Sequence, residues 1–175
     1  MAKIREIAQL GAPVLREIAE HITDYTDAAL QELMQDMQLT LEHSGGVGLA
    51  APQVFTQQRM VIVASRPTPR YPYAPEMAPT LMLNPQFTAL SEAQHKDWEG
   101  CLSIPGIRAL VPRYLDIAVS YYDVHGSMQQ VAMHGFVARV FQHEFDHLQG
   151  MVFLDRVETN RDIVTEQEFL KLRAA

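Results

Sequence analysis

The segment Gln142–His147, with the sequence QHEFDH, constrains the fold of this chain most strongly. Two histidines four residues apart on a helix project from one face, one turn apart. His143 and His147 can therefore share one metal ion, each with a ring nitrogen about 2.0–2.1 Å from it. Glu144, beside the first histidine, can reach a water at an open metal position and act as a base. The segment predicts a helix over about residues 135–149 that carries a hydrolytic metal site.

A helical wheel of this segment turns the histidines toward the interior. At 100° per residue, the face that holds both histidines spans about 60° and comprises Phe136, Val140, His143 and His147. The apolar arc continues through Val137, Phe141, Phe145 and Leu148, whereas the opposite side holds Ala138, Gln142, Asp146 and Gln149. An unpaired imidazole is costly to bury. The pattern therefore favours metal ligation over histidines that serve only as core residues.

A catalytic metal needs a third protein ligand, and the helix spacing leaves its source open. No histidine follows His147, but three glutamates remain available downstream: Glu158, Glu166 and Glu168. Upstream, the segment EGCLSIPG (residues 99–106) contains the only cysteine, Cys101. A thiolate is a good ligand for a borderline-soft dication. A Cys-His-His set would leave one position for water, as catalytic sites do and closed structural sites do not.

Length and charge limit the classes of protein that this chain can belong to. Its 175 residues and 19.8 kDa are enough for one domain with a sizeable core. The formal net charge of −7 disfavours direct binding to nucleic acid or to an anionic membrane, both of which need a basic surface. We find no apolar run near the roughly 18 residues that span a bilayer and no signal-peptide core at the start. We therefore expect one cytoplasmic domain over residues 1–175, with no membrane contact.

Elsewhere, short strands are predicted between two main helices. Helical spacing of apolar residues predicts a helix over Thr26–His43, which Gly45 and Gly46 end because glycine tolerates the left-handed conformation. Strands are predicted at 60–64, 80–84, 116–124 and 129–133, with a turn at 125–127. The proline-rich stretch Arg66–Pro79 predicts an irregular surface excursion, and residues 161–172 a short helix. We expect an α+β fold: small antiparallel or mixed sheets around the central helix, with an N-terminal helix and a short C-terminal helix.

A glycine-rich segment, GGVGLAAPQ (residues 45–53), has two interpretations. It is not a phosphate loop, because it lacks the Lys-Ser/Thr ending and follows a helix instead of preceding one. Small residues in series let another backbone approach, which suits pairing with an extended peptide ligand. A tight helix-to-strand turn would need the same glycines. The segment alone leaves both open.

Taken together, GGVGLAAPQ, EGCLSIPG and QHEFDHLQG resemble, in order and approximate separation, the three signature motifs of the peptide deformylase family. The resemblance extends to the opening MAKIREIAQLGAPVLR and to RALVPR, and so covers most of the chain up to about Val157. The stretch Arg66–Pro79 and the residues after about Asp155 are the parts that do not align with it.

The resemblance implies an activity and a role for each motif residue. Members of the family remove the formyl group from the N-terminal formylmethionine of new polypeptides, which implies nascent chains at the ribosome as partners. The implied metal ligands are Cys101, His143 and His147. The native ion would be Fe(II), with Zn(II), Ni(II) or Co(II) possible in purified protein. Glu144 would handle protons while a water on the metal attacks the formyl carbon, and Gln53 with the Leu102 N–H would hold the oxyanion.

Substrate contacts are expected from all three motifs and their flanks: Gly46, Val47, Gly48, Glu99, Gly100, Arg108, Phe136 and Val140. Phe136 and Val140 share the face of the histidines and, with Val47 opposite, would line a pocket for the methionine side chain. Plain core packing is the alternative for each of them. Arg108 would meet the substrate backbone or, alternatively, form a salt bridge.

Three other functions compete with deformylation. A zinc endopeptidase could carry HExxH, but it would need a third ligand on the helix side. A structural metal site should have four protein ligands, commonly with more than one cysteine, and no acid poised at a water. A cysteine hydrolase with a histidine base would use Cys101 as nucleophile, and metal content would distinguish it.

Overall fold

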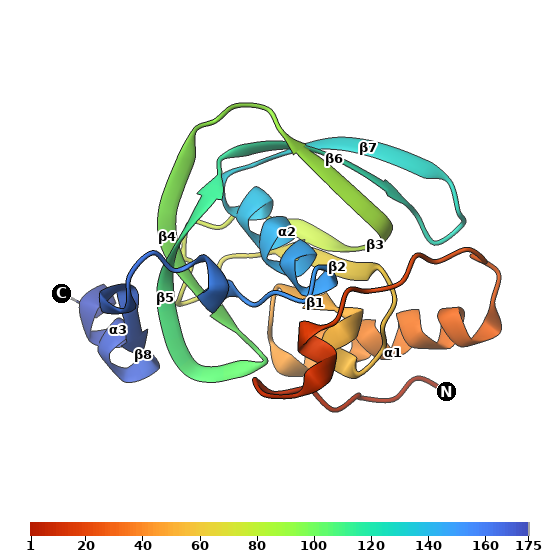
Figure 1. The fold of residues 1–175 in the computed structure, drawn as a ribbon, viewed down its shortest axis with the longest axis horizontal. Helices are drawn as coiled ribbons and strands as arrows, with labels where there is room; N and C mark the ends of the chain where they lie inside the picture. Colours follow the sequence, from red (N-terminus) through yellow and green to blue (C-terminus); the bar gives the residue numbers. More distant parts are fainter. Residues whose placement is uncertain (175) are drawn as a thin grey trace.

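Two antiparallel sheets enclose one helix, α2 (Gly135–Leu148), in the computed structural model, which describes residues 1–174 (Figure 1). The five-stranded sheet has the order β1-β2-β3-β6-β7, with strands Gly48–Ala50, Met60–Ser65, Met77–Ala89, Asp116–Tyr122 and Met128–His134. The three-stranded sheet has the order β4-β5-β8, with strands Gln94–Cys101, Ile104–Tyr114 and Ile163–Thr165. Two further helices are α1 (Ala28–Ser44) and α3 (Glu166–Ala174). Short 3₁₀ helices cover Pro13–Arg16, Ala51–Val54, Phe153–Arg156 and Asn160–Asp162. The predicted α+β class is confirmed, with both sheets entirely antiparallel.

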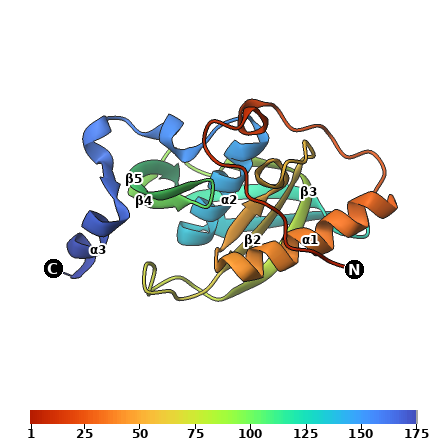
Figure 2. The ribbon, with the colours of Figure 1, turned by 90° about the horizontal axis from the view of Figure 1, so that it is seen from below.

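The strand β2 separates the two helices that cover the five-stranded sheet (Figure 2). Its side chains alternate, as the two-residue period of a strand requires. Met60 and Ile62 belong to the hydrophobic cluster that includes α1, whereas Val61 and Val63 belong to the one that includes α2. A strand buried on both faces reads as a continuous apolar run, as MVIVA does here. The strand predicted at residues 60–64 is confirmed.

The ends of α1 follow from its sequence. The Asp27 side chain accepts a hydrogen bond from Ala29 N at 3.0 Å, which satisfies one of the free N–H groups of the first turn. Gly45 ends the helix in the left-handed conformation, with φ 67°. The chain then enters β1 within three residues. The glycine-rich segment is therefore a tight turn followed by an edge strand. Its pairing with a peptide ligand stays a prediction.

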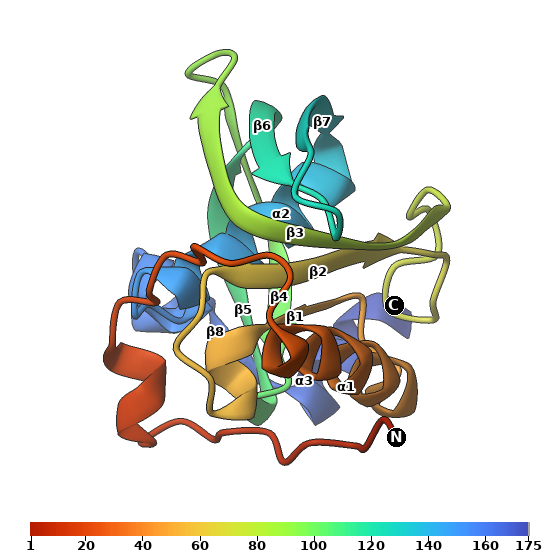
Figure 3. The same cartoon turned by 90° about the vertical axis from the view of Figure 1, so that its right-hand side faces the viewer.

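The strand β3 bends, so that its first half pairs with β2 and its second half with β6 (Figure 3). The bend coincides with Asn84, whose φ of 47° is uncommon for a residue with a side chain. Its side chain is buried and is held at both ends by the backbone of Ile22, at 2.9 Å and 2.8 Å. These bonds offset the backbone strain at the bend. The strands β6 and β7, which follow in the sheet, contact α2.

The β6–β7 hairpin and its turn match the prediction. The Asp123 carboxylate accepts from the N–H groups of His125 and Ser127, at 2.9 Å and 3.0 Å. Gly126 supplies the positive φ, 76°. The strands β4 and β5 were not predicted, because β4 is largely polar and shows no clean alternation. The excursion predicted over residues 66–79 is shorter than expected, since β3 already begins at Met77.

The expectation that the face of α2 opposite the histidines points outward is wrong. Ala138, Gln142 and Asp146 are all buried, with exposed fractions of 0%, 4% and 3%. The helix is enclosed on every side because both sheets pack against it. Its polar residues are satisfied inside: Gln142 accepts from Tyr114 N at 3.0 Å and donates to Tyr114 O at 2.9 Å. Hydrogen-bond partners inside the protein thus take the place of the water that we expected around these polar side chains.

The N-terminal segment is hydrogen-bonded to two of the motifs, the glycine-rich segment and the cysteine segment. Ala8 N donates to Gln53 O at 2.8 Å, and Leu10 N donates to Ser103 O at 2.8 Å. It is itself held on α1, where the buried Asp36 carboxylate accepts from Arg5 Nε at 2.6 Å. Within residues 1–174, no helix is long and apolar enough to cross a membrane.

Candidate active site

Cys101, His143 and His147 lie together beneath a cavity between β1 and the three-stranded sheet. Their ligand atoms are all within 4.8 Å of one another, and Cys101 Sγ is 3.4 Å from His147 Nε2. Both histidines are buried, whereas the cysteine is partly exposed. In the part of the chain that the structure describes, no other group of three such ligands is found. The end of β4 and one face of α2 thus bring the three predicted ligands together.

The three downstream glutamates are engaged elsewhere. Glu158 pairs with Lys96 at 2.9 Å, and Glu168 pairs with Lys171 at 2.6 Å on the same helix. Glu166 pairs with two arginines, Arg70 and Arg108. The cysteine, and not a glutamate, therefore completes the ligand group.

The orientation of His143 is fixed by Glu99. His143 Nδ1 lies 2.7 Å from Glu99 Oε1, so Nδ1 carries the proton and Nε2 is left as the ligand atom. Glu99 is in turn held by Arg113, at 2.9 Å and 3.0 Å, and by Arg139 Nη1 at 2.8 Å. Although burial raises the pKa of Glu99, Arg113 and His143 hold this pKa well below its ordinary value. The carboxylate is therefore ionised and holds the ring in one orientation.

Behind this contact lies a network of buried charges. Arg113 Nη1 also donates to Asp146 Oδ2 at 2.6 Å, and Arg156 donates to the same carboxylate at 2.7 Å and 3.1 Å. The side chain of Arg113 is only 4% exposed. Burying a charge is tolerable when it is paired and fully hydrogen-bonded. The network therefore fixes the position of the Glu99 side chain.

The donor set fits a divalent cation. Burial keeps the pKa of His147 well below its ordinary value, so this ring is neutral, the form that binds a metal. At His143, burial opposes protonation, but Cys101 and Glu99 raise the pKa of this ring well above its ordinary value. The negative groups around His143 thus favour a positive charge at this point. One thiolate and two imidazoles suit Fe(II), Zn(II), Ni(II) or Co(II).

Glu144 is buried beside the ligands, with 5% of its surface exposed. Burial raises the pKa of its carboxyl to about 7; the charge on Glu99 adds to this effect, while His143 and Arg113 oppose it. Its Oε2 has no hydrogen-bond partner among the described residues. The carboxylate lies directly against Gly48, where any Cβ would overlap it. Gly48 therefore provides the space for this acid, a role that the motif alone did not indicate.

Gln53 and Leu102 flank the ligand group. Gln53 Oε1 accepts from Ala50 N at 2.9 Å, so its NH₂ group must point the other way. That group lies 3.1 Å from Ser103 Oγ and 3.5 Å from Cys101 Sγ. Leu102 follows Cys101 in the turn between β4 and β5, and both residues line the cavity. The Gln53 amide donor thus lies beside the ligand group, and Leu102 lines the same cavity.

The cavity has a volume of about 840 Å³, in the upper range of small-molecule sites. The predicted substrate residues all line it: Gly46, Val47, Gly48, Glu99, Gly100, Arg108, Phe136 and Val140. Whether each contacts the substrate remains a prediction. Glu99, however, has both oxygens engaged by His143, Arg113 and Arg139 within the chain.

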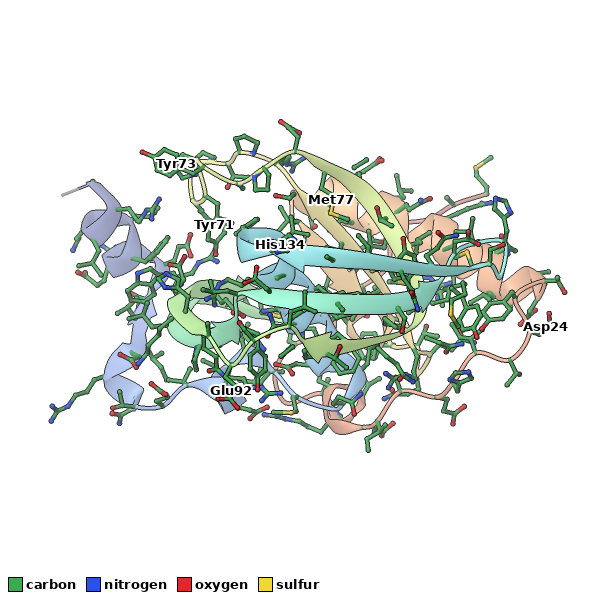
Figure 4. All side chains as sticks on the ribbon, turned by 90° about the horizontal axis from the view of Figure 1, so that it is seen from above. Asp24, Tyr71, Tyr73, Met77, Glu92 and His134 are labelled. Carbon is green, nitrogen blue, oxygen red and sulfur yellow. The ribbon has the colours of Figure 1, made fainter. Side chains whose placement is uncertain are left out.

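Two cavity walls were missed by the sequence analysis. The first is the proline-rich loop after β2, where Tyr71 packs on Phe136 with ring centroids 4.8 Å apart. Figure 4 shows Tyr73 at the outer tip of this loop, where it is 95% exposed, and Tyr71 nearer the body. The second is α3, through Glu166 and Leu170. Neither segment carries a local motif that marks it as part of a site.

Arg108 forms the salt bridge of its second alternative, with Glu166, and also lines the cavity. Its contact with the substrate backbone stays a prediction. Its guanidinium lies over Gly100, where a Cβ would overlap it. The two glycines flanking the site, Gly48 and Gly100, thus have parallel roles. One makes room for an acid and the other for an arginine.

A Cys-His-His group with both histidines buried and a buried carboxyl beside it, at the base of a cavity in an α+β fold, defines a metal-dependent hydrolase. Comparison with known proteins specifies the class further. The family model of polypeptide deformylases matches residues 4–162. "Peptide deformylase 2" of Nostoc sp. is 51% identical over 166 residues, covering 95% of this chain and 93% of the relative.

Solved structures agree with the sequence matches. A class I type b peptide deformylase from Acinetobacter baumannii, with Met-Ala-Ser bound, superposes with a TM-score of 0.86 at 40% identity, covering 90% of this chain and 100% of that chain. A peptide deformylase from Synechococcus elongatus in complex with actinonin gives 0.80 at 32%, covering 97% and 85% respectively. The chain therefore belongs to the polypeptide deformylase family. Its activity is the metal-dependent hydrolysis that removes the formyl group from formylmethionyl peptides.

Family membership also decides between the functions that the sequence left in competition. The match covers nearly the whole chain and includes all three motifs, so the endopeptidase, structural-metal and cysteine-hydrolase interpretations are wrong. The geometry agrees, since the third ligand comes from β4 and the group has three protein ligands instead of four.

Proposed function

We propose that Cys101, His143 and His147 hold one divalent cation, Fe(II) in the cell, and that Glu144, Gln53 and the Leu102 N–H carry out the remaining chemistry of deformylation. The observation that carries the proposal is the ligand group itself, whose atoms lie within 4.8 Å of one another. Its orientation by Glu99 adds to this, because a ligand held by an ionised carboxylate keeps its geometry and basicity.

Glu144 is the proton carrier of this proposal. When bound, the cation would lower the pKa of a water and polarise the formyl carbonyl. Glu144 takes a proton from the attacking water at its unpartnered Oε2 and passes it to the departing amine. A carboxyl whose pKa is raised to about 7 suits both halves of this transfer at neutral pH.

Gln53 and Leu102 stabilise the charge that develops on the formyl oxygen. The Gln53 amide is held by Ala50 and Ser103, so it needs no reorganisation during the reaction. As a neutral donor it has no acidic proton to lose to the substrate. Losing one such donor typically costs about 10²–10³ in rate. Two donors, the Gln53 amide and the Leu102 N–H, would suit a formamide oxygen.

The peptide would lie along β1, which is an edge strand with one side free of strand partners in the sheet. Gly46 and Gly48 allow the close approach of a second backbone. Val47, Phe136 and Val140 would receive the methionine side chain. The Acinetobacter baumannii relative was solved with Met-Ala-Ser bound, which supports a short peptide that begins with methionine as the ligand.

The substrate chemistry also determines where the enzyme would act. Formylmethionine begins new polypeptides, so we place its action on nascent chains near the ribosome, in the cytoplasm. The net charge of −7 indicates that such an association would not depend on direct binding to nucleic acid.

The test is formate release from a formyl-Met-Ala-Ser peptide by protein purified anaerobically with Fe(II), since thiolate ligands and Fe(II) both oxidise. Metal content and the N-acetyl analogue are measured in parallel. We expect one iron per chain, formate from the formyl peptide alone, and loss of bound metal in Cys101→Ser. Cleavage of internal peptide bonds, or full activity in a metal-free sample, would contradict the proposal.

A further inference from the structure

The outer end of the cavity carries a charge pattern that the chemistry of deformylation does not use. Three arginines and one glutamate lie there: Arg66, Arg70, Arg108 and Glu166. They come from the proline-rich loop, β5 and the start of α3, which lie on the same side of the molecule (Figure 2). The family match ends at residue 162, so Glu166 lies beyond it. This end of the site is therefore partly built from a segment outside the family match.

Glu166 joins these segments. Its carboxylate accepts from Arg70 Nε at 2.9 Å and, through its other oxygen, from Arg108 Nε. Because both contacts use Nε, the terminal nitrogens of the two arginines are not taken by this carboxylate. Arg66 is engaged through one terminal nitrogen with Gly45 O at 3.2 Å. The cluster has more cationic than anionic groups and retains free donors, in a chain whose net charge is −7.

The helix α3 is anchored and not loosely attached. Phe169 is 1% exposed and packs edge-on against Trp98, with ring centroids 5.4 Å apart. The Arg108 guanidinium lies over the same ring, 5.7 Å from its centroid. Glu166 is thus held in place at the rim by the rest of its helix.

We propose that Arg70, Arg108 and Glu166 form a specificity site that reads the charge of the peptide just after the formylmethionine, favouring acidic over basic side chains. The arginines attract the acidic side chain, and Glu166 limits that attraction by neutralising part of their charge. An extended peptide advances about 3.3–3.6 Å per residue, so the second or third side chain is the one that meets the rim. The inference rests on the cavity being the peptide site, as proposed above.

The test compares kcat/KM for formyl-Met peptides that carry Asp, Asn or Lys at the second or third residue. All peptides are C-terminal amides, so that a terminal carboxylate cannot supply the same anion. We expect Asp to exceed Lys about fivefold at one of the two positions, the upper range for an exposed ion pair, with Asn between. High salt should reduce the difference, since exposed charges are screened.

Two variants and a matched control assign the effect. Arg70→Gln should reduce the Asp-over-Lys ratio to about twofold, whereas Glu166→Gln should increase it. Arg173→Gln removes one charge from the same helix away from the cavity and should leave the ratio unchanged. Arg70→Gln also leaves the Arg108–Glu166 pair intact, so it tests the site even if Glu166→Gln loosens α3.

Equal rates for Asp and Lys at both positions, or a ratio that Arg70→Gln does not change, would overturn the proposal. Absence of formate from the uncharged Asn peptides would instead overturn the proposed function. The two failures are therefore distinguishable.

Discussion

The two ends of the cavity are built on different principles. At the inner end, Glu99 and Arg113 are about 95% buried and every oxygen of Glu99 is engaged. At the outer end, the side chains of Arg70 and Glu166 are 51% and 24% exposed, and the carboxylate leaves the terminal nitrogens of both arginines free of it. Buried charges must be fully paired, because an unpaired one is costly. Exposed charges have no such requirement and can exchange partners with a ligand.

The difference separates chemistry from recognition. A group that must orient a metal ligand needs one fixed geometry, and a dense buried network supplies it. A group that recognises peptides of variable sequence needs hydrogen-bond donors that are free and exposed at the surface. The inner end also lies wholly within residues 4–162, which the family model matches, whereas the outer end draws on α3 beyond it.

Removing Arg113 should produce the largest effect on stability. Arg113→Met leaves Glu99 and Asp146 with one partner fewer inside the protein, which typically costs about 3–5 kcal/mol. Lys96→Met breaks exposed pairs with Glu158 and Asp162 and should cost no more than about 1 kcal/mol. Urea unfolding followed by circular dichroism measures both. Equal free energies of unfolding for the two variants would show that the buried network matters no more to stability than exposed ion pairs elsewhere in the chain.

The two glycines give a matched test of function. Gly48→Ala should displace the Glu144 carboxylate and reduce kcat by about 10²-fold, as a misplacement of about 1 Å does. Gly100→Ala should displace Arg108 instead, with an effect of a few fold, mainly on KM. Steady-state formate release measures both variants. The same loss of kcat in each would show that the inner and outer ends are not separate.

Glu99 should control metal affinity. Glu99→Gln weakens the contact with His143 Nδ1, and loss of such a partner typically costs about 10–100-fold in affinity. Competition with a chelator for Zn(II) measures this without any assay of activity. Asp97→Asn, two residues away on the same strand, makes the same change in charge and should leave affinity unchanged. If both variants bind zinc like the wild type, His143 does not depend on Glu99.

The smallest expected effect is the pH dependence at the rim. Burial raises the pKa of Glu166, but the hydrogen bond from Arg108 and the charges of Arg108 and Arg70 lower it overall from 4.5. Since the folded pKa is depressed, the stabilisation is complete above 4.5 and is lost as the pH falls through the lowered value. The stability difference between wild type and Glu166→Gln should therefore disappear in acid. A difference that grows on acidification would contradict the assignment.

Features of the fold and the site could be predicted where the residues that form them lie close together in the sequence. His143, Glu144 and His147 lie within one turn of each other on a helix, so local spacing predicted them. The strand MVIVA and the turn at His125–Ser127 were local signals of the same kind. The expectation for the outer side of α2 failed because a wheel assumes solvent, and here the partner of Gln142 is the backbone of Tyr114.

The cavity walls could not be predicted, because their contacts are distant in sequence. Arg70 and Glu166 in the wall are 96 residues apart. In the network behind the site, Arg113 and Asp146 are 33 residues apart. The strand β4 was missed for a related reason: Glu99 sits inside it and is paired with arginines from β5 and α2. A polar residue in that position breaks the alternation on which strand prediction relies.

The most direct test of the account is a single comparison of Glu144→Gln with the wild type, measuring bound metal and formate release on the same samples. Glu144 is not one of the three ligands, so the variant should keep one divalent ion per chain. Its rate of formate release should fall by about 10²–10⁴-fold, the usual contribution of a positioned acid–base group. Formate release at the wild-type rate by a metal-loaded variant would show that the buried carboxyl beside Gly48 does not carry the proton.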